Sequence, residues 1–353
     1  MRLGLNIGTL GEFELIKRLT AHLPGRADVL LGVGDDCAVL DLQSEALLLT
    51  TCDSQVEGVH FTLQTSSPEQ IGRKALAINL SDIAAMGGEP RYALISLILP
   101  PALPLSVLEG IYAGLRAEAT RFNTALVGGN VAGTGQAAQL IIDITLLGTV
   151  ERGHVLMRSG AQVGDILFVT GTPGDSAAGF YTLLHPDPAY PARAQEVVRQ
   201  RHRTPNPRVH EGRILSQLGT NVVTAMLDIS DGLSGDLEHL CTRSQVGALI
   251  EAERLPLSPA LRAIAAHTLR DPLDWALHGG EDYELLFTVA PGSEQLVSEA
   301  VQSATGTPVT PIGVILPAPD GMKVRYSNQR EERLASKSWD HLKASLERPA
   351  AEK

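Results

Sequence analysis

Carboxylates follow several apolar runs of this sequence, at positions where strands of an α/β protein would end. They are Asp35, Asp36, Asp53, Asp228 and Asp231. Loops at strand ends are free to converge and commonly bind ligands. Several carboxylates directed at one space repel one another unless a cation lies between them, and hard oxygen ligands suit Mg²⁺, which keeps water or phosphate oxygens as further ligands. The pattern indicates a site for magnesium and phosphate, although each aspartate alone could be a turn or N-cap residue.

Asp82 lies inside the mostly small and apolar segment 75–86, which is predicted to be helical. An interior aspartate is a mediocre helix former, and burying its charge without a partner is costly. We favour metal coordination by Asp82, with support from Asn79 or Ser81. An ion pair with Lys74, two helical turns earlier, is the structural alternative.

Two glycine-containing segments could bring the backbone close to a ligand. In residues 128–130 (GGN), backbone N–H groups could cradle a phosphate, and a plain glycine turn explains the pattern equally well. Residues 279–280 are also glycines and precede Glu281, which we expect to accept hydrogen bonds or to pair with a cation. An ordinary turn with solvated acids is the alternative for that segment.

Two single basic residues, Arg158 and His60, are further candidates for a binding site. Arg158 has few other cations near it in the sequence, and an arginine can grip phosphate with two hydrogen bonds. His60 is a lone histidine, and such residues are more often structural than functional.

No stretch reads GxxxxGKS or GxxxxGKT, no GxGxxG follows a predicted strand, and no EF-hand spacing occurs. The sequence therefore supports neither the common nucleotide-binding loops nor a structural calcium site.

The composition is that of a globular, acidic protein. Its 353 residues suggest two domains, each large enough to bury a core. Hydrophobic residues make up 44% and charged residues 20%, which excludes disorder for most of the chain. The net charge of −11 argues against broad electrostatic binding to nucleic acid or anionic membranes, so we expect neither as a partner. An anionic substrate must be met locally, by metal ions.

The cysteines and apolar runs bear on the compartment. Cys37, Cys52 and Cys241 show no CxxC spacing and are odd in number, which favours a reducing environment over a disulfide framework. Residues 1–18 do not read as a signal peptide, and the apolar run 93–105 is interrupted by prolines and too short to span a bilayer. We expect a cytoplasmic protein.

Runs rich in Val, Ile and Leu alternate with helical patterns, which is typical of an α/β chain. Ser67, Pro68 and Gln70 form a capping-box pattern, so we expect a helix over residues 68–86. A second helix is predicted over residues 105–122. The predicted strands cover residues 46–51, 92–99, 140–150, 166–170, 222–227 and 284–289.

Glycines in the segment 151–164 predict a domain boundary. We therefore expect an N-terminal domain over residues 1–152, a C-terminal α/β domain over 153–346 and a solvated tail over 347–353. The proline-rich segment 185–208 is predicted to be an exposed connection that contains a short helix.

Taken in order, the motifs resemble the thiamine-monophosphate kinase family, within the aminoimidazole ribonucleotide synthetase-like superfamily, from about residue 11 to residue 341. The motifs are GVGDD, TTCDSQVEGVHF, KALAINLSDIAAMGGEP, VGGN, RSGAQVGD, VTGTPGDSAAG, LDISDGL and HGGEDYELLF. The resemblance implies a two-domain α/β (α+β) fold and a homodimer in which the N-terminal sheets form a shared barrel. It also implies Mg²⁺-dependent transfer of the γ-phosphoryl group of ATP to thiamine phosphate, giving thiamine diphosphate, with ATP between the two domains.

The resemblance also implies roles for individual residues. Those expected at Mg²⁺ are Asp36, Thr51, Cys52, Asp53, Asp82, Asp228 and Asp231, with Thr51 and Cys52 contributing main-chain oxygen. Those expected at ATP are Gly129, Asn130, Arg158 and Ser230, and those expected at thiamine phosphate are His60, Glu281 and Trp339. We expect no catalytic nucleophile and no dedicated general base, because the acceptor is a phosphate with a second pKa near ~6 and is largely deprotonated at neutral pH.

The chain has Asn130 and Cys52 where the family usually carries Asp and Thr or Ser. Asn130 keeps an oxygen but removes a charge, which predicts weaker affinity for one Mg²⁺ ion with activity retained. These two departures motivate an alternative function, a degenerate protein that binds ATP or thiamine diphosphate without turnover. A further alternative is another ATP-dependent member of the same superfamily acting on a different acceptor, against which the NLSDIAAMG and GGEDYELLF segments argue.

Overall fold

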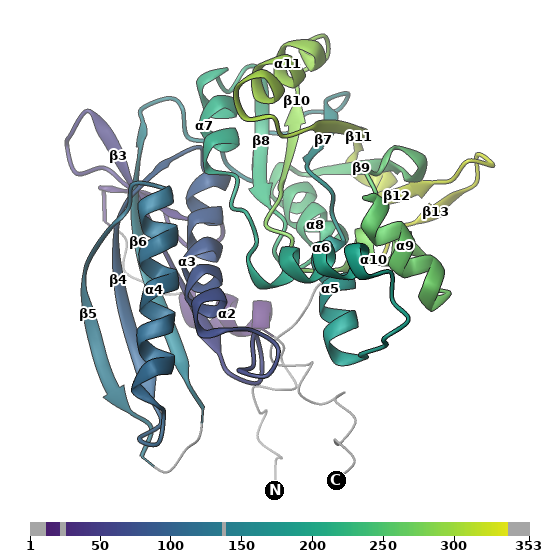
Figure 1. Ribbon diagram of the computed structural model, residues 1–353. Coiled ribbons are helices and arrows are strands. Elements are labelled where there is room, and N and C mark those ends of the chain that lie inside the picture. The colour runs from purple at the N-terminus through teal and green to yellow at the C-terminus, as the bar shows by residue number, and fades with distance from the viewer. Residues whose placement is uncertain (1–11, 22–25, 136–138, 338–353) are drawn as a thin grey trace, which may run out of the picture.

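The computed structural model describes residues 12–21, 26–135 and 139–337. The strands form two β-sheets, one from each half of the chain (Figure 1). The first sheet has the strand order β1-β2-β3-β6-β4-β5. Its strands are β1 (Val29–Leu31), β2 (Ala38–Leu40), β3 (Ala46–Val56), β4 (Glu89–Leu99), β5 (Ala125–Gly133) and β6 (Ile141–Glu151). All neighbours pair antiparallel except β4 and β5, which are parallel.

The second sheet has the order β13-β12-β9-β11-β7-β10-β8. Its strands are β7 (Ile166–Thr170), β8 (Val223–Asp228), β9 (Val246–Glu251), β10 (Leu285–Val289), β11 (Val309–Pro317), β12 (Met322–Arg325) and β13 (Glu331–Arg333). Here β12 and β9 are parallel and the other neighbouring strands antiparallel. Strands β7 and β10, together with the edge strand β8, are almost completely buried. Helices α3 and α8 pack against β8.

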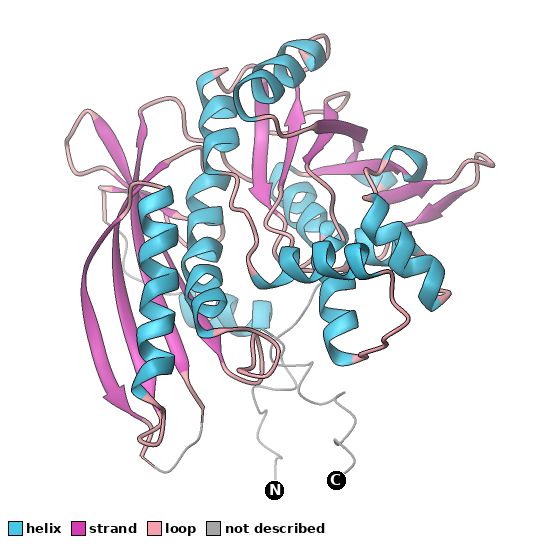
Figure 2. Ribbon diagram, in the orientation of Figure 1, coloured by secondary structure: helices cyan, strands magenta, loops and turns pink. Residues whose placement is uncertain are grey.

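The helices pack around and between the sheets (Figure 2). They are α2 (Glu12–Thr20), α3 (Pro68–Ala85), α4 (Leu105–Arg121), α5 (Asp175–Leu184), α6 (Ala192–Arg203), α7 (Val209–Gln217), α8 (Leu233–Ser244), α9 (Pro259–Thr268), α10 (Pro272–His278) and α11 (Glu294–Thr305), with short 3₁₀ turns η1 (Ala252–Arg254) and η2 (Ala318–Asp320). In Figure 2, α3 and α4 stand on one side of the first sheet. Helix α3 contacts strands β3 and β6 of that sheet, and also α7 and β8 of the second half. It is therefore the element that joins the two halves.

The sequence explains why α3 occupies this central position. Ser67 and Gln70 form the expected capping box, with Ser67 Oγ accepting from the Gln70 N–H, so the start of the helix is fixed. Between Ala75 and Ala85 the helix carries mostly small and apolar residues, and nearly all of them are buried. A helix segment of this kind is stable only when several of its sides are covered. Residues of both halves accordingly share one hydrophobic core.

The predicted mixed α/β fold is confirmed, and the differences from the predicted elements are local. The predicted strands and the helices at 68–86 and 105–122 are present, with ends that match or shift by at most five residues. The segment 185–208 differs more, because α6 fills half of it and both His202 and Arg208 are buried. Among the helices of the described ranges, none combines the length and the apolar character that crossing a bilayer requires.

Candidate active site

Three aspartates from distant parts of the chain meet between the two halves. Asp36 precedes β2, Asp82 lies in the last turn of α3, and Asp228 is the last residue of β8. Each offers a carboxylate oxygen, and these oxygens lie within 4.8 Å of one another. Asp36 and Asp228 are buried, and Asp82 is partly accessible. The convergence that the sequence predicted for these three residues is present.

Hydrogen bonds hold two of these carboxylates in place. Ser81 Oγ donates to Asp228 Oδ2 at 2.6 Å. Thr51 Oγ1 donates to Asp82 Oδ2, so Thr51 reaches the cluster through its side chain. The ion pair of Lys74 with Asp82, which was the structural alternative to metal coordination, is not formed among the described residues, because the Lys74 ammonium lies against Glu281 instead.

Withdrawal from water and mutual repulsion disfavour the charged form of this cluster. Burial and then the charges of Asp53 and Asp228 raise the pKa of Asp82 well above its usual range. Burial and then Asp36 raise the pKa of Asp228 to about 8. A divalent cation at this point would reverse the unfavourable balance, since it favours the ionised carboxylates.

Arg158 supplies positive charge beside the cluster. Its Nε lies 3.1 Å from Asp36 Oδ1, and its Nη2 also donates to that oxygen. Its backbone N–H points at the Asp35 carboxylate, at 3.2 Å from Oδ2. Asp36 Oδ2 is buried and has no hydrogen-bond partner among the described residues. A buried carboxylate oxygen without a donor, beside two further carboxylates, fits a hard cation such as Mg²⁺.

Asp53 borders the same cluster, and Asp231 lies with Asp228 near the buried Asp236, whose pKa both charges help to raise. The charge of Asp53 contributes to the raised pKa of both Asp82 and Asp228, and the Asp53 N–H donates to Asn79 Oδ1 at 3.2 Å. The Asp231 N–H donates to the buried Asp236 carboxylate at 3.1 Å. Asn79 and Ser81, one of which was expected to support Asp82, act on other members of the site instead. Asn79 accepts from the backbone of Asp53, and Ser81 donates to Asp228.

Two residues expected near metal or nucleotide lie on the other face of the first sheet. Asn130 pairs in register with Ser96, Ser96 with Asp143, and Asp143 with Ser54. Ser54 Oγ donates to Asp143 Oδ2 at 2.6 Å, and Cys52 Sγ lies 3.3 Å from Asp143 Oδ1. Because side chains alternate along strands, this row faces away from α3. Within this chain, the side chains of Cys52 and Asn130 thus do not join the carboxylate cluster.

Gly129 lies in the same exposed strand, so residues 128–130 form part of β5 and not a glycine turn. A Cβ at Gly129 would collide with the backbone carbonyl of Ile95 on the parallel strand β4. The glycine is required here for close strand packing.

Lys74 contacts both Glu281 and His60, so these two residues lie near one another. Lys74 Nζ is 2.6 Å from Glu281 Oε1 and 3.4 Å from the His60 carbonyl oxygen. His60 Nδ1 accepts a hydrogen bond from the Val56 N–H at 3.0 Å, which fixes the imidazole ring. The expectation that Glu281 pairs with a cation is confirmed. Trp339, the third residue expected at thiamine phosphate, lies outside the described residues.

The backbone around Glu281 is held in an unusual conformation. Glu281 and Tyr283 have φ angles of +64° and +52°, in the left-handed region that costs free energy for these residues. Their N–H groups donate to the carbonyl oxygens of Ser230 and Ile229 at 2.7 and 2.9 Å. Gly280 allows this approach, since a Cβ there would lie 2.7 Å from Ser230 O. The glycine pair thus brings backbone against the segment that follows β8.

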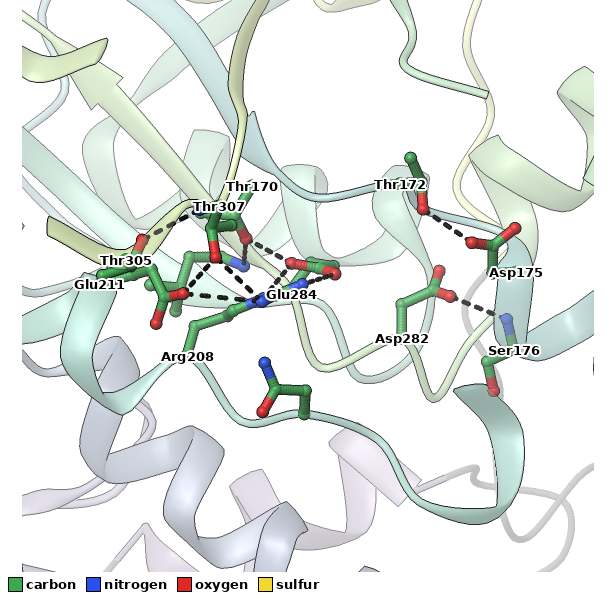
Figure 3. Close-up of polar contacts among 12 residues, drawn as sticks. Thr170, Thr172, Asp175, Ser176, Arg208, Glu211, Asp282, Glu284, Thr305 and Thr307 are labelled. Carbon is green, nitrogen blue, oxygen red and sulfur yellow. Dashed lines mark hydrogen bonds and ion pairs between the residues drawn. The ribbon is translucent and has the colours of Figure 1, made fainter. Parts of the chain in front are cut away.

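The side chains of Asp282 and Glu284 anchor the same segment (Figure 3). The Asp282 carboxylate accepts from the N–H groups of Gly174 and Ser176, at 2.6 and 3.1 Å, at the start of α5. Arg208 donates to Glu284 Oε1 and Oε2 at 2.5 and 2.6 Å. Burial alone would raise the pKa of Glu284, but Arg208 outweighs it, so that the pKa is lowered.

Sequence reasoning missed this buried network. Arg208 lies in a proline-rich stretch that was predicted to be exposed. Glu284 lies in the HGGEDYELLF motif, in which only Glu281 was considered as a functional residue. The available signal was the position of Glu284 directly before the apolar run of residues 285–289, which predicts a buried strand and hence a partner for the charge.

Comparison with known proteins agrees with this fold. Residues 34–150 match the family model described as AIR synthase related protein, N-terminal domain, and residues 162–324 match the corresponding C-terminal domain. The chain is therefore an AIR synthase-related protein, a class whose two domains correspond to the two sheets.

Relatives within that class are more specific. The thiamine-monophosphate kinase of Bacillus subtilis is 35% identical over 95% of this chain and 100% of its own length. That of Escherichia coli K12 is 38% identical over 86% of this chain and 90% of its own. A solved structure described as AaThiL complexed with AMPPCP and TMP has a TM-score of 0.81 at 34% identity, covering 96% of this chain and 99% of that one. This chain belongs to the thiamine-monophosphate kinase family.

Proposed function

We propose that this protein transfers the γ-phosphoryl group of ATP directly to thiamine phosphate in the presence of Mg²⁺, forming thiamine diphosphate and ADP. The observation that carries the proposal is the meeting of Asp36, Asp82 and Asp228 between the two halves of a chain of this family. Phosphoryl transfer asks mainly for positioning and for neutralisation of charge, and little covalent chemistry from the protein.

Each group of residues has a distinct part in this proposal. Asp36, Asp82 and Asp228 would hold Mg²⁺, with Thr51, Cys52, Asp53 and Asp231 as further expected ligands. When bound, the metal supplies neutralisation of the phosphate oxygens of both substrates. Gly129, Asn130, Arg158 and Ser230 are proposed to bind ATP, and His60, Glu281 and Trp339 to bind thiamine phosphate. No side chain is needed as general base, since the acceptor phosphate is already deprotonated.

We propose that the active protein is a homodimer. The face of the first sheet that points away from α3 carries exposed Tyr92 and Leu94, and the edge strand β5 exposes Val127 and Val131. An exposed apolar sheet with an open edge is a common protein interface. A second copy on this face would form the expected shared barrel, and it would give the side chains of Cys52 and Asn130 new neighbours.

The proposed domains are residues 1–152 and 153–346, followed by the tail 347–353. The ranges of the two family matches, 34–150 and 162–324, support this division. We also propose a cytoplasmic location. Cys37, Cys52 and Cys241 are free thiols, which supports a reducing compartment.

The activity is tested by incubating the purified protein with ATP, Mg²⁺ and thiamine phosphate and measuring both products. We expect ADP and thiamine diphosphate in equal amounts, and no product with EDTA. Asp82→Asn should abolish turnover, whereas Asp187→Asn, which removes an exposed partner of His267, should not. Tight binding of ATP or thiamine diphosphate without turnover would instead support the degenerate binding protein. Consumption of ATP only with another acceptor would support a different superfamily member.

A further inference from the structure

Lys74 is a buried cation that contacts candidate substrate-binding residues from both halves of the chain. Its side chain is only 4% exposed. Its ammonium group lies 2.6 Å from the Glu281 carboxylate and 3.4 Å from the carbonyl oxygen of His60. One side chain of α3 thus links a loop of the first half to a loop of the second half.

Lys74 and Glu281 differ in their exposure to solvent, and this difference indicates different roles. The Glu281 side chain is 27% exposed, so its carboxylate can meet a ligand. Lys74 lies behind it, withdrawn from solvent. A group in this position acts on a ligand through Glu281 and not by direct contact.

His202 holds the other oxygen of the same carboxylate. Its Nδ1 lies 3.4 Å from Glu281 Oε2 and 3.2 Å from Ser176 Oγ. Burial and then the charge of Lys74 lower the pKa of His202 to about 3, so the imidazole is neutral. Lys74 therefore supplies the positive charge that faces the Glu281 carboxylate. The left-handed backbone conformation restrains Glu281 through its main chain.

We propose that Lys74 is a positioning residue for thiamine phosphate, holding the Glu281 carboxylate and the His60 loop in the arrangement that accepts this substrate. The inference rests on the proposed kinase activity. An oriented anion suits thiamine phosphate, whose thiazolium ring is positively charged, whereas ATP has no such cation. Lys74 should therefore affect the binding of one substrate and not of the other.

The test is steady-state kinetics of Lys74→Met with each substrate varied in turn. We expect the KM for thiamine phosphate to rise about 30-fold or more, as expected when one partner of a buried charge pair is removed, with the KM for ATP and kcat nearly unchanged. Arg213→Met is the matched control. It removes an ion pair between α7 and β6, with Arg213 Nη1 2.6 Å from Glu151 Oε2, which also joins the two halves but lies outside the site. Its KM values should stay at the wild-type level.

Two further variants keep the test decisive if Lys74→Met alone does not fold. They are Glu281→Gln and the double variant Lys74→Met with Glu281→Gln. The double variant leaves no unpaired charge. We expect the double variant to have the same KM for thiamine phosphate as Glu281→Gln. A further increase in the double variant, an increase in the KM for ATP, or an unchanged KM in Lys74→Met would overturn the inference. A wild-type protein that forms no thiamine diphosphate would instead overturn the proposed function.

Discussion

Ser81 Oγ donates a hydrogen bond of 2.6 Å to Asp228 Oδ2, and this bond joins the last turn of α3 to the end of β8. Its two residues are 147 positions apart in the sequence and both are buried. Asp82, the neighbour of Ser81, belongs to the carboxylate cluster itself. The geometry of the proposed metal site therefore depends on how the two halves of the chain pack together.

Replacing Ser81 by alanine should weaken Mg²⁺ binding. Groups that orient a metal ligand typically contribute about 10-fold or more to affinity, and Asp228 would lose its donor in this variant. The concentration of Mg²⁺ that gives half-maximal turnover measures the effect. Ser216→Ala is the control, since Ser216 is equally buried but donates to the His154 carbonyl oxygen. An identical Mg²⁺ dependence of Ser81→Ala and Ser216→Ala would contradict this role.

The stability of the metal-free protein should fall as the pH rises. The folded-state pKa of Asp228, about 8, is above the value of ~3.9 expected in the unfolded chain. The folded state therefore holds a proton that the unfolded state releases, and the resulting stabilisation, complete below about pH 4, is lost as the pH rises through about 8.

Thermal unfolding in EDTA at about pH 6 and about pH 9 measures this loss. We expect Asp228→Asn to lose less stability over this interval than the wild type, because asparagine does not titrate. Saturating Mg²⁺ should reduce the pH dependence of the wild type, since the metal favours the ionised carboxylates. Equal pH dependence of the two proteins in EDTA would show that Asp228 does not titrate as described.

Removing Arg208 should destabilise the second half strongly. Arg208→Met leaves the buried Glu284 carboxylate without its cation (Figure 3), a change that typically costs about 3–5 kcal/mol. The double variant Arg208→Met with Glu284→Gln should recover much of this loss, because no unpaired charge remains. Urea unfolding gives both free energies. Additive effects of the two substitutions would mean that the charge pair is not the source of the loss.

A charge on the outer face of the first sheet should disrupt the proposed dimer. Leu94→Glu places a carboxylate among the exposed apolar residues of this face, where a second copy would bury it. Light scattering after size-exclusion chromatography should give the mass of a monomer for this variant and of a dimer for the wild type. Leu269→Glu, at a position that is 93% exposed on the other half, should remain dimeric. A wild type that is monomeric would refute the dimer.

The sequence was sufficient to predict features that depend on local patterns. The capping box at Ser67 and Gln70 locates the start of α3, and the apolar runs locate the main strands. Asp82 was recognisable as a site residue because a charge in an apolar helix needs a partner. These inferences use only neighbours along the chain.

Contacts over long distances were less accessible. The sequence offered Lys74 a partner two turns away in Asp82, but its actual partner, Glu281, follows more than 200 positions later. Likewise, the face of β3 to which Cys52 points follows from strand register, which the sequence alone did not provide. Family resemblance named Thr51, Cys52 and Asp53 without indicating which of them share a side of the sheet.

A crystal structure with Mg²⁺ and a non-hydrolysable ATP analogue tests the central claim most directly. We predict metal density between the two halves, with oxygens of Asp36, Asp82 and Asp228 at about 2.0–2.1 Å from Mg²⁺ and the phosphates completing the coordination. Nucleotide and metal bound elsewhere, with these three carboxylates making no contact to the ion, would contradict the account.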